Sequence, residues 1–388
     1  MAFEKKLSIL RRLKRKFNKI KSCFEYTIRK STTETNNNVL FLCSTKIKGK
    51  NLVQLIYYFR SCGYNCYLDY SFRQCLKLNI HGICAISLRE IFQIKKKFNN
   101  FSVIVSPDKQ SLDSFNSNAL KIHLNYLEIK NGFQNINEVT ENDFYYPIGF
   151  HQTFYFPSCY GVNLSQSIES ETLKNVFSSN RKIGAIFAGA LFCKWDGQTN
   201  KYNQDSIKEN FCIENRGTIF SHILEKLPQE HLYIPDTLKD FLDSMEAGHL
   251  KNKTVLIERN NFSIPYEKYF EVLLNTNFYI HMPGVTYPFC HNQIESMAAG
   301  CIPITQLGKF FIPSFTHEFD SLLFNTPDEL INLLSSVSTG KYTSKINDMR
   351  NEIANYYIDH YSIESFRKRL SFLFDKNIKH TKFWIVLP

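Results

Sequence analysis

Strand-like apolar runs alternate with helix-like stretches along this chain, and the alternation begins twice. The first series includes runs at 38–44, 101–108 and 119–125, and the second includes runs at 182–190 and 277–284. Short apolar runs separated by amphipathic stretches favour parallel strands joined by crossover helices. We therefore expect an α/β protein with two doubly wound, Rossmann-like domains that face a cleft, where ligands prefer to bind.

Polar stretches between the parts divide the 388 residues into five predicted segments. A basic amphipathic helix and a polar linker that contains STTETNNN come first. Two α/β domains follow, separated by an interdomain linker, and the last segment is a closing helix with a tail. In chain order the predicted segments are 1–37, 38–150, 151–178, 179–360 and 361–388.

Basic charge is concentrated near the start of the sequence. Residues 1–30 contain eleven Lys or Arg and two Glu, which gives them a net charge of +9. The whole chain has a net charge of +11, so the remaining residues carry only +2. Leu7, Leu10, Leu13 and Phe17 are three or four positions apart, which predicts an amphipathic helix. Such a helix suits an anionic membrane surface, although packing on the body or a solvated tail is an alternative. The nearly neutral remainder argues against nucleic acid as a partner.

The cysteines and the hydropathy pattern indicate a cellular location. The 11 cysteines are scattered without paired CxxC units, so we expect a reducing compartment and no structural zinc. No apolar stretch has the length of a membrane-spanning helix, and no apolar core of a secretory signal follows the first basic residues. We expect a cytoplasmic protein, held peripherally at the inner face of the membrane by residues 1–30.

The stretch 281–306 reads HMPGVTYPFCHNQIESMAAGCIPITQ. A Pro-Gly loop leads into a helix-like stretch whose only acid is Glu295, and a strand-like IPIT follows. A helix N-terminus presents free N–H groups and positive potential, which suit a diphosphate. On residue type alone, Glu295 is either a ligand-binding carboxylate or a solvated helix acid. The loop and the helix start contribute four further candidate donor-binding residues, Gly284, Thr286, His291 and Asn292.

The segment NQIESMAAGCIPIT resembles the exostosin-like and group-1 bacterial glycosyltransferases, which are of the GT-B type. YYPIGFHQTFYFP, RKIGAIFAG, EFDSLLFNTPDELINLL and YSIESFRKRL agree in order, so the resemblance covers roughly 145–370. It implies transfer of a sugar from a nucleotide-sugar donor to a glycan or lipid-linked glycan acceptor, as in surface polysaccharide synthesis. It also implies that Glu295 binds the ribose hydroxyls and that the enzyme requires neither a metal nor a further cofactor.

The chain departs from the retaining group-1 pattern at one position. That pattern has two Glu eight residues apart, whereas Tyr287 stands eight residues before Glu295. The stereochemistry therefore stays open between retaining and inverting. An inverting reaction needs a base, which Asp, Glu or His can supply. The candidate bases, each of which also has a structural interpretation, are Asp69, Asp108, His123 and His151.

The leaving diphosphate also needs stabilisation by positive charge. Arg216 begins a predicted helix and Arg259 ends a predicted strand, and the planar fork of Arg suits phosphate oxygens. A surface cation or a buried ion pair is the alternative for each. Gly189 at a strand end allows close approach of a ligand, or merely a turn, and Glu258 is placed to contact the base or ribose.

Two other functions fit the same pattern. One is a non-catalytic protein of this fold that binds a nucleotide sugar or a glycan. The other is a transferase of sugar phosphate or polyol phosphate.

Overall fold

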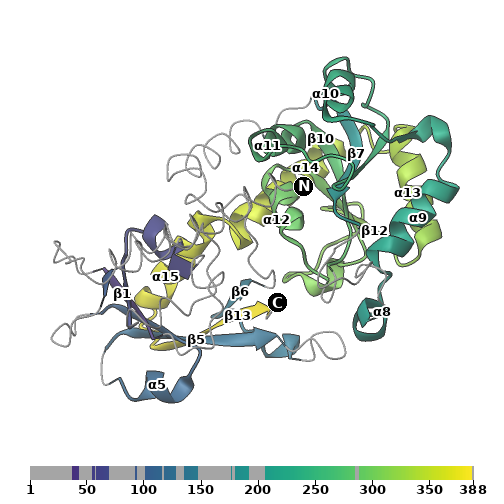
Figure 1. Cartoon of the computed structure of the whole chain (residues 1–388). Helices are drawn as coiled ribbons and strands as arrows, with labels where there is room; N and C mark the ends of the chain where they lie inside the picture. Colours follow the sequence, from purple (N-terminus) through teal and green to yellow (C-terminus); the bar gives the residue numbers. More distant parts are fainter. Residues whose placement is uncertain are drawn as a thin grey trace, which may run out of the picture.

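The computed structural model describes residues 37–42, 55–56, 58–69, 92–93, 101–115, 118–127, 135–146, 176, 180–191, 206–284 and 288–386. These residues form two separate parallel sheets with helices around them (Figure 1). The strand orders confirm the expected α/β class with two doubly wound, Rossmann-like domains. The predicted N-terminal helix lies outside the described residues.

The first sheet is parallel at every described pairing. Its central strands are continuous apolar runs because both faces of the sheet are covered. Across the sheet the described strands are β3 (Phe92–Gln93), β2 (Asn65–Leu68), β1 (Asn38–Phe41), β4 (Val103–Ser106), β5 (Leu120–Leu127), β13 (His380–Val386) and β6 (Phe144–Tyr146).

Strand β13 returns from the far end of the sequence and lies between β5 and β6. Residues 361–388 were expected to form a closing helix and tail; the helix is present as α15 (Ile363–Asp375), and the strand was not predicted. Asp143 accepts hydrogen bonds from the Lys382 amide at 3.0 Å and from Trp384 Nε1 at 3.1 Å. The Phe366 ring of α15 packs 5.0 Å from that of Phe144. The last described segment therefore belongs to the first sheet and its core.

The second sheet is also parallel throughout its described pairings. Strands β7 and β10 lie side by side at its centre, and their residues are almost entirely buried. Across the sheet the described strands are β12 (Leu322–Leu323), β11 (Ile302–Thr305), β10 (Thr276–His281), β7 (Ile183–Gly189), β9 (Thr254–Glu258) and β8 (Leu232–Tyr233).

Several helices begin at residues that cap them. Asn215 accepts from the Thr218 amide and Thr326 from the Glu329 amide, which satisfies an exposed N–H group in each first turn. None of the described helices is long and apolar enough to cross a membrane. The remaining described helices are α5 (Lys109–Asp113), α8 (Ser206–Phe211), α9 (Arg216–Lys226), α10 (Leu238–Glu246), α11 (Tyr266–Leu274), α12 (His291–Ala298), α13 (Pro327–Ser338) and α14 (Ile346–His360), with the 3₁₀ turns η2 (Ile136–Glu138), η4 (Gln229–His231) and η5 (Gly308–Phe310).

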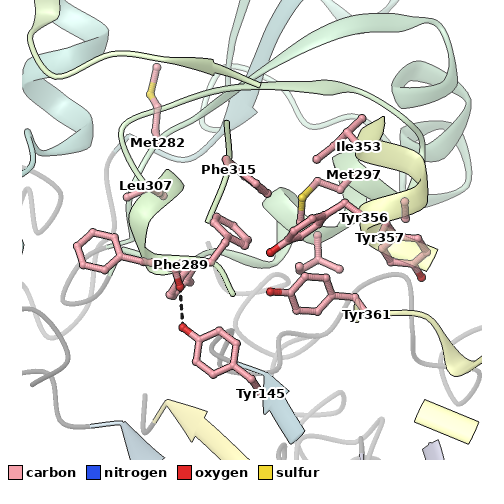
Figure 2. Close-up of a cluster of buried hydrophobic side chains, with 14 of the residues drawn as sticks. Tyr145, Met282, Phe289, Met297, Leu307, Phe315, Ile353, Tyr356, Tyr357 and Tyr361 are labelled. Atoms are coloured by element: carbon pink, nitrogen blue, oxygen red, sulfur yellow. Dashed lines mark hydrogen bonds between the residues drawn. The ribbon is translucent and has the colours of Figure 1, made fainter. Parts of the chain in front are cut away.

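A cluster of buried aromatic side chains joins the two domains (Figure 2). Tyr145 of β6 donates its hydroxyl hydrogen to the Phe310 carbonyl of η5 at 2.6 Å. The Phe311 ring stacks on that of Phe315 at 4.2 Å, and Tyr356 packs against Phe315 at 5.0 Å. Side chains of both sheets therefore belong to one continuous apolar core.

Candidate functional site

The strand order of the second sheet reverses between β7 and β10. After β7 the chain adds β8 and β9 on one side, whereas β10, β11 and β12 follow on the other side. In doubly wound sheets, ligands bind beyond the carboxyl ends of the strands at such a point. Gly189 ends β7, Glu258 ends β9 and Gly284 follows β10, so the fold brings three predicted residues to this edge.

Helix α12 begins at the same edge. Its N-cap residue is Cys290, whose side chain accepts no hydrogen bond from the first turn. The predicted residue Asn292 is 6% exposed and donates from Nδ2 to the Tyr279 hydroxyl at 2.9 Å. Its buried Oδ1 has no hydrogen-bond partner among the described residues. The side chain of His291 and all of Thr286 lie outside the described part of the structure.

Tyr279, which is fully buried, and Tyr269, which is partly buried, connect α12 to its neighbours. Tyr279 donates to the Ala188 carbonyl at 3.1 Å and lies 3.2 Å from the hydroxyl of Tyr269. Burial, with smaller contributions that include the nearby Glu295 carboxylate, raises the pKa of both hydroxyls. Glu295 itself lies in the second turn of α12 and is 1% exposed. The predicted ribose ligand is thus a buried carboxylate beside two phenol groups.

His281 ends β10 with a fully buried ring. The Ser296 hydroxyl donates to the Gln293 carbonyl at 2.8 Å, so it accepts from His281 Nε2 at 3.0 Å. This assigns the neutral tautomer, and His281 Nδ1 has no hydrogen-bond partner among the described residues. Burial lowers the pKa of His281 to about 3, so the ring is uncharged at neutral pH.

Arg216 is the first residue of α9, and its buried guanidinium ties three segments of the edge together. Its Nη1 donates to the Ala190 carbonyl at 2.8 Å, and its Nε donates to the Pro283 carbonyl at 2.9 Å. Its Nη2 lies 3.0 Å from Cys290 Sγ. The guanidinium also lies 5.6 Å from the centre of the Phe187 ring. A positive charge therefore lies where β7, β10 and α12 meet.

Glu258 and Arg259 have different surroundings. The Glu258 carboxylate accepts from the Leu191 amide at 3.1 Å and from the Asn260 amide at 3.1 Å, so it holds the loops after β7 and β9. The Arg259 side chain is exposed, while its backbone N–H donates to the Gly189 carbonyl. Contacts of either side chain with a ligand stay predictions.

Two of the predicted bases lie together in the first domain. Asp108 is the N-cap of α5, where its carboxylate accepts from the Gln110 amide at 3.2 Å and from Ser111 Oγ at 2.6 Å. His123 of β5 lies beside it and hydrogen-bonds to the Pro107 carbonyl. Burial lowers the pKa of His123, which favours the neutral, proton-accepting ring.

The other two predicted bases are not part of this pair. Asp69 directly follows β2, and β1 separates β2 from β4 in the sheet; partial burial raises the pKa of its carboxyl. His151 lies outside the described residues. The choice of base among the four candidates stays a prediction.

Cys290, Tyr279 and His281 lie at the candidate site but were not predicted from the sequence. A tyrosine and a histidine inside an apolar strand have the pattern of ordinary core residues. A cysteine before a helix does not have the side-chain oxygen of the common caps. Only the meeting of β7, β10 and α12 places them around Arg216 and Glu295.

No family model and no curated protein sequence matches this chain. HepE from Anabaena, solved in complex with UDP, is 12% identical to this chain and has a TM-score of 0.39. The match covers 88% of this chain and 100% of HepE. A glycosyltransferase from Rickettsia africae is 10% identical to this chain and has a TM-score of 0.44. The match covers 88% of this chain and 99% of that protein. Because these TM-scores are below 0.5, the fold assignment rests on the strand order of the two sheets.

Proposed function

We propose that this chain is a glycosyltransferase of the GT-B type. It binds a nucleotide-sugar donor at the carboxyl edge of the second sheet and transfers the sugar to a glycan or lipid-linked glycan, in surface polysaccharide synthesis. The observation that carries this proposal is the buried guanidinium of Arg216 at the point where the strand order reverses.

The charge at this edge favours an anionic ligand. The hydrogen-bond partners described for Arg216 are two carbonyls and the Cys290 thiol. Burial raises the pKa of that thiol, so it is uncharged at neutral pH. The first turn of α12 adds the positive end of a helix dipole. A diphosphate is the part of a nucleotide sugar that matches both features.

The same charge assists the reaction. The bond between the anomeric carbon and the diphosphate oxygen breaks, and a bond from the anomeric carbon to an acceptor oxygen forms. The acceptor proton passes to a base, and the diphosphate leaves with the electron pair. Arg216 and the start of α12 stabilise the negative charge that develops on the leaving group.

Ligand-induced thermal shifts with UDP, GDP, ADP, CMP and their sugar conjugates test the proposal. A ligand that binds the folded chain raises its Tm by mass action. Arg216→Lys keeps the charge but loses the planar fork, and we expect the Kd of the best nucleoside diphosphate to rise about tenfold. Release of nucleoside diphosphate from the nucleotide sugar then separates a transferase from a binding protein.

Arg181→Lys is the matched control. Arg181 is also buried and donates to backbone carbonyls, those of Val176 and Ala299, but it precedes β7 at the opposite edge of the sheet. Both variants lose stability, whereas only Arg216→Lys loses ligand affinity. Absence of a thermal shift with every nucleotide contradicts the proposed function. Equal loss of affinity in both variants shows that the effect comes from the fold and not from the site.

A further inference from the structure

Gln306, directly after β11, uses both ends of its side-chain amide on one backbone residue. Its Oε1 accepts from the Glu214 amide at 2.9 Å, and its Nε2 donates to the Glu214 carbonyl at 2.8 Å. The side chain is 8% exposed, so both hydrogen bonds are shielded from water. Two hydrogen bonds to one residue fix both its position and its orientation, as a neighbouring strand does.

The residue that Gln306 holds lies two positions before Arg216. Between α8 and α9 the chain turns through Cys212, which has a φ of 53°. A non-glycine residue in this left-handed region is strained and persists only where its surroundings hold it. Asn215 then caps α9, and Arg216 is the first residue of the helix. The direction in which the Arg216 side chain leaves the backbone therefore depends on this turn.

The residues that follow Gln306 support the same region. The Phe310 ring of η5 packs 5.7 Å from that of Phe211, the last residue of α8. It also packs 6.5 Å from Phe289, which directly precedes Cys290. The segment after β11 thus contacts both the turn before Arg216 and the loop before the α12 N-cap, which are the two segments that Arg216 joins.

We propose that Gln306 is a positioning residue for Arg216, and through it for the diphosphate of the donor. This inference rests on the proposed function and adds to the site a residue that directly follows β11. Gln306 does not touch the ligand. Gln306 fixes the turn that directs the Arg216 guanidinium toward the carboxyl ends of β7 and β10. Loss of the Gln306 amide therefore weakens the contact with phosphate and leaves the contact with the nucleoside unchanged.

The test compares the affinities of a nucleoside diphosphate and of its parent nucleoside. The wild-type chain is titrated with UDP and uridine, or with the diphosphate that gives the largest thermal shift and its nucleoside. Gln306→Met keeps the size of the side chain but removes both hydrogen bonds. We expect its Kd for the diphosphate to rise about tenfold and its Kd for the nucleoside to change less than twofold. Gln306→Leu, which also removes both hydrogen bonds and adds no charge, serves if the Met variant does not fold.

Asn277→Ala is the matched control for a buried amide. Asn277 is also 8% exposed and donates to a backbone carbonyl, that of Ile183, but at the amino-terminal edge of the same sheet. We expect Asn277→Ala to lower the free energy of unfolding and to leave the ratio of the Kd values for the diphosphate and the nucleoside unchanged. A second control combines Gln306→Met with Arg216→Lys. In this double variant we expect Gln306→Met to change the Kd for the diphosphate less than twofold, because the two residues act together.

The outcomes separate the two proposals. If wild type binds a nucleoside diphosphate but the Gln306 variants keep the wild-type affinity ratio, the positioning role is wrong and the proposed function stands. Additive losses in the double variant also overturn the positioning role. If wild type binds no nucleoside diphosphate, both proposals fall.

Discussion

Several polar side chains are buried at the carboxyl edge of the second sheet. Glu295 and Asn292 of α12 and His281 of β10 are each 8% exposed or less. Burial of polar groups is costly unless hydrogen bonds replace the lost water. Their position together at one edge is consistent with a ligand that supplies further hydrogen bonds, and Glu295 and His281 each make a separate prediction.

Glu295→Gln tests the predicted ribose contact. The amide keeps the size of the side chain but loses the charge and one acceptor oxygen, so we expect the Kd of the bound nucleotide to rise about tenfold. We expect the variant to remain folded, with a cooperative urea unfolding transition, because the amide matches the carboxyl group in size. Isothermal titration and urea unfolding measure the two quantities. Glu246→Gln, at an exposed ion pair with Lys182, is the control. Unchanged nucleotide affinity would exclude Glu295 as a ligand.

His281 predicts a pH dependence of stability. Its folded-state pKa of about 3 lies below the ordinary value of 6.5, so between these values only the unfolded chain binds the proton. Stability from this group is therefore lost as the pH falls below 6.5. From pH 7 to pH 5 we expect wild type to lose about 2 kcal/mol more than His281→Gln, in urea unfolding at each pH. Parallel pH profiles for the two proteins would contradict the assignment.

At the scale of elements, local patterns predicted the central strands of the second sheet but not β13 of the first sheet. The runs at 182–190 and 277–284 are apolar because central parallel strands are covered on both faces, and they form β7 and β10. β13 contains His380, Thr381 and Lys382, and its partners in β5 lie about 260 positions earlier in the chain. No pattern within a short stretch of sequence shows that two segments so far apart pair with each other.

Asp143→Ala tests how β13 is held. Asp143 accepts from the Thr140 amide, the Lys382 amide and Trp384 Nε1, and it is 7% exposed. Without it these donors lose their acceptor, and we expect a loss of about 3 kcal/mol in the free energy of unfolding. Chemical denaturation measures it, with Asp328→Ala at an exposed helix start as control. Nucleotide affinity should not change, because β13 belongs to the other sheet. A loss below about 1 kcal/mol would show that strand pairing and apolar packing hold β13 without this carboxylate.

At the scale of the molecule, the chain crosses between the domains more than once. It passes from the first sheet to the second and returns through α15 to place β13 in the first. The Tyr145–Phe310 hydrogen bond and the surrounding aromatic rings lie at this joint (Figure 2). Because η5 also contacts the segments that lead to Arg216 and Cys290, the joint and the candidate site share one piece of chain.

Membrane association through residues 1–30 remains a prediction at this scale. These residues carry +9 of the +11 net charge, so their deletion should abolish sedimentation of the protein with anionic vesicles. Activity on a soluble acceptor, and the thermal shift with nucleotide, should survive the deletion. Vesicles of neutral lipid provide the control for charge. Persistent binding of the shortened chain to anionic vesicles would place the membrane contact elsewhere.

Local sequence patterns were sufficient to predict the α/β class, the two doubly wound domains and the helix that contains Glu295. These features depend on local periodicity and on residues close together in the chain, which a single sequence displays. The tertiary structure was needed to show that Arg216 and Cys290 lie at the same edge as His281, that Gln306 holds the turn before Arg216, and that β13 completes the first sheet. Those contacts join residues tens to hundreds of positions apart. They stabilise the protein only in the folded state, in which the strands lie in their final order.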